Sequence, residues 1–278
     1  MTGRTSRLLL GALAFGYAFL YVPILSMIVY SFNESRLVTV WAGFSLKWWG
    51  EFIRNEDMLE AAWLSFRIAV VNGFVATLLG ASAGFALARY PRFAGRSIFS
   101  GLIAAPLVMP EVIMGIASLL LFVVLERLTG WPERGFTTIA IAHITFSAAF
   151  VAVIIQSRLA DFDRSLEEAA MDLGARPFTV FRTVTLPLIA PALVSGWLLA
   201  FTLSMDDVIL AQFTAGPQSQ TLPMLVYSSV RLGVSPQINV LATIIVTVVG
   251  SAIVLAGWLM HRARRQRERD AHAAAQVT

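Results

Sequence analysis

Long apolar segments alternate with shorter polar segments along the chain. The apolar segments are residues 8–30, 65–87, 98–125, 136–155, 188–213 and 238–260. A helix needs about 20 predominantly apolar residues to cross the roughly 30 Å hydrocarbon core of a bilayer, and each segment is that long. The pattern therefore predicts an all-α membrane protein with six transmembrane helices. The first segment is too long for a signal peptide and lacks a clear cleavage site, so we expect it to be retained.

Glycines and prolines modify two of these predicted spans. Gly80 and Gly84, four residues apart in the second span, permit close approach to a neighbouring helix. Pro106 and Pro110 in the third span remove backbone donors and predict a kink or a break.

Composition narrows the class of protein. Only 14% of the residues are charged, against about 25% in soluble domains. The chain has no cysteine, which excludes disulfides and thiolate metal sites. Its one lysine, Lys47, lies in Ser-Leu-Lys-Trp-Trp and not in a phosphate-binding Gly-Lys-Ser/Thr sequence. We therefore expect no catalytic residue, metal site or cofactor on this chain, and any ATP and Mg²⁺ to be bound by a partner subunit.

The basic residues predict the orientation in the membrane. With both termini on one side, the segments on that side hold 14 of the 21 Lys and Arg residues. The positive-inside rule places that side in the cytoplasm. We expect residues 1–260 to form one transmembrane domain with a cytoplasmic loop at 160–187, and 261–278 to be a basic cytoplasmic tail. The basic residues lie at segment ends and on this tail, which suits lipid headgroups and does not indicate nucleic acid.

The cytoplasmic loop predicts a short helix of its own. Ser165 followed by Glu168 is the pattern of a capping box. Apolar residues then recur at helical spacing, at Leu166, Ala169, Ala170 and Leu173. Gly174 stands where a left-handed C-terminal cap is wanted. A second short helix is expected after Pro177, and Pro187 suits the first turn of the next span. An amphipathic helix lying on the membrane surface is the alternative.

The same loop resembles a known one. Glu168-Ala169-Ala170, three residues, Gly174, nine residues and Val184-x-Leu186-Pro187 are similar to the EAA loop of bacterial ABC importer permeases, in which Ile is usual at the place of Val184. The resemblance implies a coupling helix that docks on a separate ATPase subunit. The residues it assigns to this coupling are Ser165, Glu168, Ala169, Ala170, Gly174, Leu186 and Pro187.

Three carboxylates lie within the predicted spans. Counted from the cytoplasmic ends, Glu111 is about 20 Å along its span and Asp206 about 27 Å, with Asp207 next to it. Carboxylates at such depth are typical of functional sites, and a cluster attracts a cation. Trp197, Phe201 and Tyr227 are candidates for cation–π contacts to the same cation.

Structural roles for these residues stay open. Asp206 and Asp207 point about 100° apart on a regular helix, so both face one point only if the helix is broken. One of them is then a candidate to pair with Arg67 or Arg231. Glu111 is alternatively a cap at a helix broken by its neighbouring prolines. His143 is predicted to be a packed or hydrogen-bonded polar residue.

Two spans carry a more specific resemblance. Residues 201–208, Phe-Thr-Leu-Ser-Met-Asp-Asp-Val, and 105–112, Ala-Pro-Leu-Val-Met-Pro-Glu-Val, are similar to segments of putrescine and spermidine permease subunits, where Asp is common at the place of Glu111. The resemblance covers nearly the whole chain. It implies the permease fold of type I ABC importers, in the bacterial inner membrane. The partners it implies are a paralogous permease subunit, an ATPase dimer and a periplasmic polyamine-binding protein.

Other functions remain as alternatives. The chain is alternatively a permease for another solute, such as iron or another small cation or organic solute. An ion channel, a membrane enzyme and a structural scaffold are alternatives of other classes. The sequence does not distinguish putrescine from spermidine.

Overall fold

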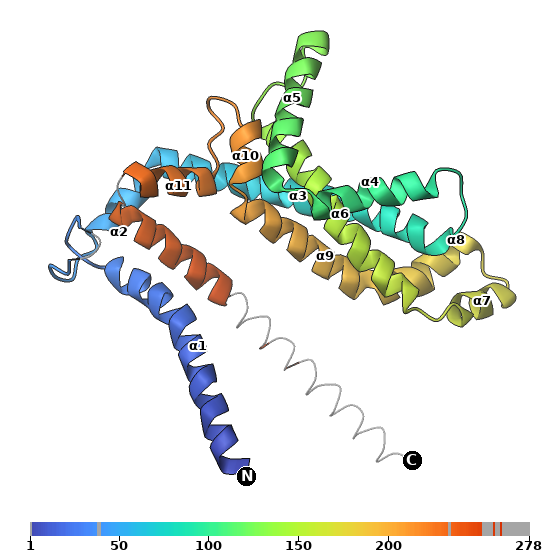
Figure 1. The fold of residues 1–278 in the computed structure, drawn as a ribbon, viewed down its shortest axis with the longest axis horizontal. Coiled ribbons are helices and arrows are strands. Elements are labelled where there is room, and N and C mark those ends of the chain that lie inside the picture. The colour runs from blue at the N-terminus through green and yellow to red at the C-terminus, as the bar shows by residue number, and fades with distance from the viewer. Residues whose placement is uncertain (1, 38–39, 233–234, 252–257, 259–261, 263–278) are drawn as a thin grey trace. The chain divides into compact units, whose positions relative to one another are not determined.

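The computed structural model of the chain describes residues 2–37, 40–232, 235–251, 258 and 262. Named secondary-structure elements within these ranges are all helices (Figure 1). In chain order they are α1 (Thr2–Tyr30), α2 (Lys47–Ile53), α3 (Glu56–Arg89), α4 (Arg96–Val108), α5 (Glu111–Thr129), α6 (Phe136–Ala160), α7 (Ser165–Asp172), α8 (Pro177–Val180), the π-helix η1 (Phe181–Thr185), α9 (Leu186–Asp206), α10 (Ile209–Thr214) and α11 (Leu222–Leu232). The predicted all-α class is confirmed.

Two compact units make up the structure, one of residues 1–56 and 229–278 and one of residues 57–228. In the first unit, the connection after α1 folds around the buried side chain of Asn33. The Asn33 amide donates to the carbonyl of Val40 and accepts from the backbone of Ala42. The Phe32 ring stacks on Phe44 and Trp49. Asn33 and these aromatic contacts therefore order the described residues of this connection.

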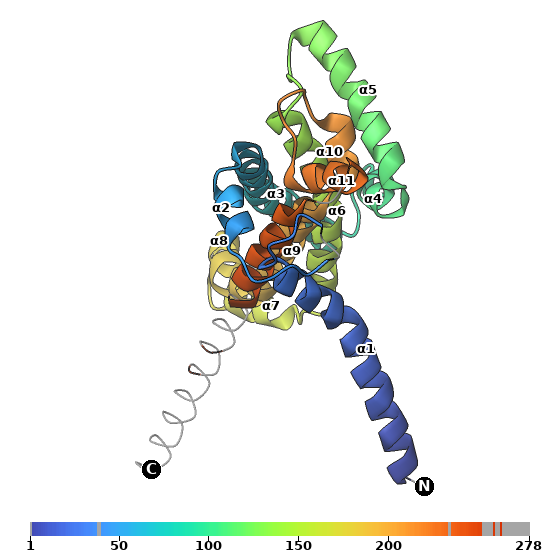
Figure 2. The ribbon, with the colours of Figure 1, turned by 90° about the vertical axis from the view of Figure 1, so that its left-hand side faces the viewer.

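The core of the second unit lies where α3, α6 and α9 meet, and α6 and α9 run side by side (Figures 1 and 2). Its buried apolar residues are Ala76, Val151, Ile155, Leu159, Ile189, Ala192 and Ala200. A Cβ added to Gly80 would lie 2.6 Å from the Ala148 carbonyl oxygen, and one added to Gly84 would lie 2.5 Å from that of Ala152. The predicted close approach at these two glycines is confirmed, and the neighbouring helix is α6.

Five helical stretches in the described residues are long and apolar enough to cross a membrane. They are 9–30, 56–89, 111–129, 136–160 and 177–206. The sixth predicted span, 238–260, is helical from Pro236 to Ser251, and its remainder lies mostly outside the described residues. So does the predicted tail 261–278, apart from Arg262.

The helix boundaries differ from the predicted spans in three places. α3 begins at Glu56, nine residues before residue 65, because the residues at 56–60, three acids together with Met58 and Leu59, continue the helix. The third span is two helices, broken at Met109 and Pro110 as the proline predicts, whereas Pro106 stays inside α4. Between the fifth and sixth predicted spans the structure has a further helix, α11, in which the apolar residues Leu222, Leu225 and Val226 have helical spacing.

Candidate functional site

A second break divides the fifth predicted span. α9 ends at Asp206, and Asp207 has extended backbone angles (φ −67°, ψ 126°) before α10 begins at Ile209. The Asp207 carboxylate accepts a hydrogen bond of 2.9 Å from the backbone N–H of Ala211, in the first turn of α10. This carboxylate therefore caps the helix that starts after the break.

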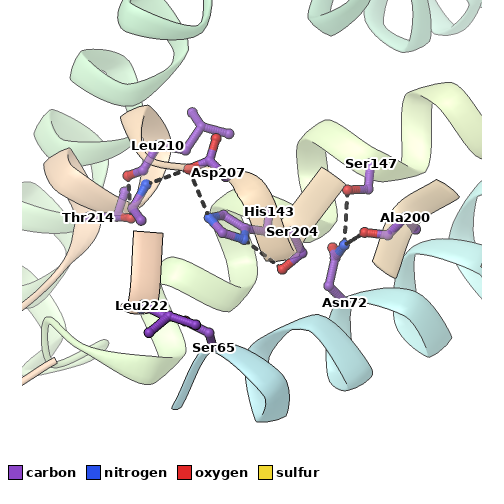
Figure 3. Close-up of polar contacts among 11 residues, drawn as sticks. Ser65, Asn72, His143, Ser147, Ala200, Ser204, Asp207, Leu210, Thr214 and Leu222 are labelled. Carbon is purple, nitrogen blue, oxygen red and sulfur yellow. Dashed lines mark hydrogen bonds and ion pairs between the residues drawn. The ribbon is translucent and has the colours of Figure 1, made fainter. Parts of the chain in front are cut away.

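His143 of α6 holds the same carboxylate from the other side (Figure 3). Its Nε2 atom lies 3.3 Å from Asp207 Oδ1, and its Nδ1 atom lies 2.8 Å from the hydroxyl oxygen of Ser204. The His143 side chain is 2% exposed and that of Asp207 is 7% exposed. The hydrogen-bonded interpretation of His143 is confirmed. Asp207 thus contacts His143, and the Arg67 guanidinium lies 5.0 Å from the ring centre of Phe136. The pairing of one aspartate with Arg231 stays a prediction.

Asp206 lies on a different side of α9 and is exposed. Thr202 and Ser195, four and eleven residues before it, lie on the same face by the helical repeat and are also exposed. Each hydroxyl donates to a carbonyl four residues earlier, Thr202 to Leu198 at 2.6 Å and Ser195 to Pro191 at 2.9 Å. Because these two hydroxyl groups use their protons in bonds to the helix backbone, their oxygens can only accept hydrogen bonds from a ligand. The ionised Asp206 carboxylate is likewise an acceptor only. The face therefore suits a ligand rich in hydrogen-bond donors.

The break between α4 and α5 places the third acid. Glu111 is the first residue of α5, and the backbone of Met109 and Pro110 before it is extended. Glu111 lies within electrostatic range of both Asp206 and Asp207. α5 packs on α10, where Gly115 leaves room for the Phe213 ring. The structure thus gathers the three predicted carboxylates at two helix breaks.

Two of the predicted aromatic residues belong to a separate surface. The rings of Trp197 and Phe201 stack with their centres 5.3 Å apart. Phe201 also packs on Phe66, which stacks on Trp63, and Trp197 also packs on Phe74. Trp197 lies nine residues before Asp206 on the same helix. At about 100° per residue, this separation puts the two side chains on opposite sides of α9. The structure does not bring these rings to the acids. Tyr227 is exposed on α11.

A cavity of about 720 Å³ lies at the start of α3. Its polar and aromatic lining includes Asp57, Glu60, Trp63, Arg67, Gln218 and Gln220. Trp63 is also the end of the aromatic series that reaches Trp197. The cavity and the aromatic series therefore form one continuous surface along α3.

The predicted loop at 160–187 forms the two short helices that the sequence predicts, with a different N-terminal cap. Ser165 is the first residue of α7, and its backbone N–H donates to the Asp163 carboxylate at 2.9 Å. Hydrogen bonds from Ser165 hold the pKa of Asp163 below its ordinary value. The predicted capping box of Ser165 and Glu168 is wrong, because Asp163 lies two residues earlier and reaches the free N–H first.

The C-terminal end of α7 is capped as predicted. Gly174 has a left-handed backbone (φ +85°). Its N–H donates to the Met171 carbonyl at 2.8 Å, and the N–H of Ala175 donates to the Ala170 carbonyl at 3.1 Å. These two bonds define a Schellman motif. Pro177 then begins α8, and Pro187 lies in the first turn of α9, both as predicted.

The loop presents an exposed apolar surface. Leu173 is 90% exposed and Phe178 is 75% exposed, and Leu166 and Met171 are exposed beside them. Glu168 and Ala169 are exposed on the same short helix. A surface of this kind indicates an interaction with another protein or with the membrane.

Sequence reasoning missed two polar residues that the fold uses. Asn72 of α3 is buried and donates to Ser147 of α6 at 3.0 Å and to the Ala200 carbonyl of α9 at 2.6 Å. Glu167 of α7 contacts both Arg89 and Thr185. The sequence contained one hint in each case. For Asn72 it was a lone amide inside a span, and for Glu167 it was its partner Arg89, a basic residue at the end of a span.

Comparison with known proteins identifies the family. Residues 76–277 match the family described as "Binding-protein-dependent transport system inner membrane component". The chain belongs to this family, and it is a membrane-embedded permease subunit of the ABC transporter class, without catalytic activity of its own.

Individual relatives agree with this class. The chain is 55% identical over 259 residues to the "Putrescine transport system permease protein PotI" of Escherichia coli (strain K12), covering 93% of this chain and 92% of the relative. It is 44% identical over 246 residues to the "Spermidine/putrescine transport system permease protein PotC" of the same strain, covering 88% of this chain and 90% of the relative.

Solved structures confirm the fold of ABC importer permeases. A chain of a bacterial ABC transporter that imports the acidic polysaccharide alginate superposes with a TM-score of 0.68 at 20% identity, over 93% of this chain and 95% of that one. A chain of the MetNI methionine ABC transporter in an inward-facing conformation has a TM-score of 0.58 at 20% identity, over 74% of this chain and 95% of that one.

Proposed function

We propose that this chain forms part of the pathway by which an ATP-driven importer moves a polyamine, putrescine or spermidine, into the cell. Support comes from the two groups of relatives and from the acids at the two helix breaks. A polyamine carries two or more ammonium groups, and charge-assisted hydrogen bonds from these groups to carboxylates are about twice as strong as neutral ones.

The observation that carries the proposal is the division of roles between the two adjacent aspartates. His143 and the backbone of Ala211 hold Asp207 in the fold, and Asp206 stays exposed on α9. We assign the ammonium contact to Asp206, with Glu111 as the second carboxylate. Thr202 and Ser195 continue the acceptor surface towards the cytoplasmic end of α9.

The proposed assembly has six spans with both termini in the cytoplasm. A paralogous permease completes the pathway, a periplasmic binding protein delivers the polyamine, and an ATPase dimer docks on the exposed surface of α7 and α8. In the proposed mechanism, ATP-driven closure of that dimer displaces α7, and the spans alternate between outward and inward access.

Uptake of labelled putrescine and spermidine tests the substrate. Cells that lack the chain are complemented with the wild type, with Asp206→Asn or with Asp206→Glu, at matched membrane levels. The proposal expects uptake to depend on the chain, to fall with Asn and to be better retained with Glu. Unchanged polyamine uptake without the chain would refute the polyamine assignment, and an iron or other small-cation importer would then be tested in the same cells.

A further inference from the structure

The carboxylate of Glu167 joins three segments that are far apart in the sequence. Its Oε1 atom lies 2.7 Å from Nη2 of Arg89, at the C-terminal end of α3, and accepts a hydrogen bond from the hydroxyl of Thr185, at the end of η1. The side chains are 10% exposed for Arg89 and 17% exposed for Glu167. A charge-assisted contact that is largely removed from water is screened little and is costly to break.

Further contacts hold the end of α3 to the same region. The Arg164 guanidinium donates to the Ala88 carbonyl at 3.2 Å, and the Arg89 guanidinium lies 5.4 Å from the ring centre of Phe162. Phe85 of α3 packs edge to face on Phe181 of η1 at 5.8 Å between ring centres. The segment before α7 and the segment after α8 therefore both contact α3.

The segment that contains Thr185, η1, has an irregular helical geometry. η1 has π-helical geometry over Phe181–Thr185 and continues without interruption into α9. A single π turn inside a helix disturbs the regular hydrogen-bond ladder and is rare in proteins overall. Where such turns do occur, they are often at functional sites. Glu167 contacts the last residue of this turn, where α9 begins.

Glu168, the neighbouring acid, lies about 100° further round α7 and is exposed. The two acids therefore face different surroundings. We propose that Glu167 transmits displacement of α7 to α3 and α9, as a positioning residue that contacts neither substrate nor ATP. This proposal rests on the proposed function, in which an ATPase docks on α7.

The test uses the complete transporter, reconstituted in proteoliposomes with its ATPase, its partner permease and its binding protein. ATP hydrolysis and putrescine transport are measured together for the wild type, Glu167→Gln and Thr185→Val. Glu133→Gln, the same change at an exposed acid in the connection between α5 and α6 and outside α7 and α8, is the matched control. Co-purification of the ATPase with each variant is measured in parallel.

The expected result is that Glu167→Gln lowers the number of polyamines moved per ATP at least fivefold, while the ATPase still co-purifies and hydrolyses ATP. Thr185→Val is expected to lower it by a smaller factor, because it removes only one of the two contacts. Glu133→Gln should match the wild type. A charge exchange, Arg89→Glu with Glu167→Arg, should recover part of the loss seen for Arg89→Glu alone.

Two outcomes overturn the proposal. One is an unchanged number of polyamines per ATP in both Glu167→Gln and Thr185→Val. The other is loss of ATPase co-purification in Glu167→Gln, which would place this acid in the docking surface. If the ATPase fails to co-purify with the wild type, the docking function itself is wrong, so the two failures are distinguishable.

Discussion

The Nε2 atom of His143 lies 3.3 Å from Oδ1 of Asp207, where α9 is broken inside a predicted membrane span. Both side chains are buried, and Asp207 also caps α10. The break turns the two adjacent aspartates into groups with different surroundings. One acid stabilises the irregular backbone, and Asp206 remains accessible to a ligand.

His143→Leu should destabilise the protein and abolish uptake. Leaving a buried polar group without its partner costs about 1–3 kcal/mol, and this variant removes a contact of the Asp207 carboxylate and the hydrogen-bond partner of Ser204. The measurement is thermal unfolding of the purified protein in detergent. His143→Leu combined with Asp207→Leu should recover much of the stability without restoring uptake. A single variant as stable as the wild type would show that the contact contributes nothing to the fold.

Ser195→Ala should weaken substrate affinity during transport. One hydrogen bond is worth about 0.5–1.5 kcal/mol net, which corresponds to a rise in KM of roughly two- to tenfold. Ser82→Ala is the matched control, since Ser82 is also exposed and donates to a carbonyl four residues earlier, on α3. Kinetics of putrescine uptake provide the measurement. Equal KM values for the two variants would remove Ser195 from the pathway.

Asn72→Leu should loosen the core of the second unit. Its amide makes two hydrogen bonds that join α3 to α6 and α9. Interhelical hydrogen bonds in membranes contribute about 0.6–1.7 kcal/mol each, so we expect a loss of roughly 1–3 kcal/mol. Ser147→Ala removes only one of these bonds and should cost less. The order of unfolding temperatures in detergent checks this, and a Ser147 variant less stable than the Asn72 variant would contradict it.

Substitutions at Gly174 should follow backbone conformation and not size. Gly174 has φ +85°, and a Cβ there would meet nothing within 4 Å. Asn tolerates left-handed geometry, Ala tolerates it less, and a β-branched residue is the worst. Uptake should therefore fall in the order Gly174→Asn, Gly174→Ala, Gly174→Val at equal membrane insertion. Robust uptake by the valine variant would contradict a role for this cap in coupling.

Local features of the fold could be predicted from the sequence, and distant contacts could not. The glycine cap at Gly174 and the proline starts at Pro177 and Pro187 depend on neighbouring residues only. Arg89 and Glu167 are 78 residues apart, and no spacing rule joins them. The wrong capping box shows the limit of local patterns, since Asp163 competed for the same backbone group.

The positions of Trp197 and Phe201 relative to Asp206 could be predicted from helical periodicity. Trp197, Phe201 and Asp206 share one helix, and helical periodicity alone places the two rings away from the acid. The structure agrees, because both rings pack in the series along α3. The partner of Asp207, in contrast, depended on how α6 packs on α9, and the sequence contained no signal for that register.

The central claim is that Asp206 contacts a polyamine in a pathway driven by a separate ATPase. The most direct measurement is ATP-dependent uptake of labelled putrescine by the reconstituted transporter, with Asp206→Asn compared with wild type at equal ATPase content. The account predicts uptake by the wild type that requires ATP, and at least a tenfold lower kcat/KM for Asp206→Asn. Equal kcat/KM values for the two proteins would contradict it.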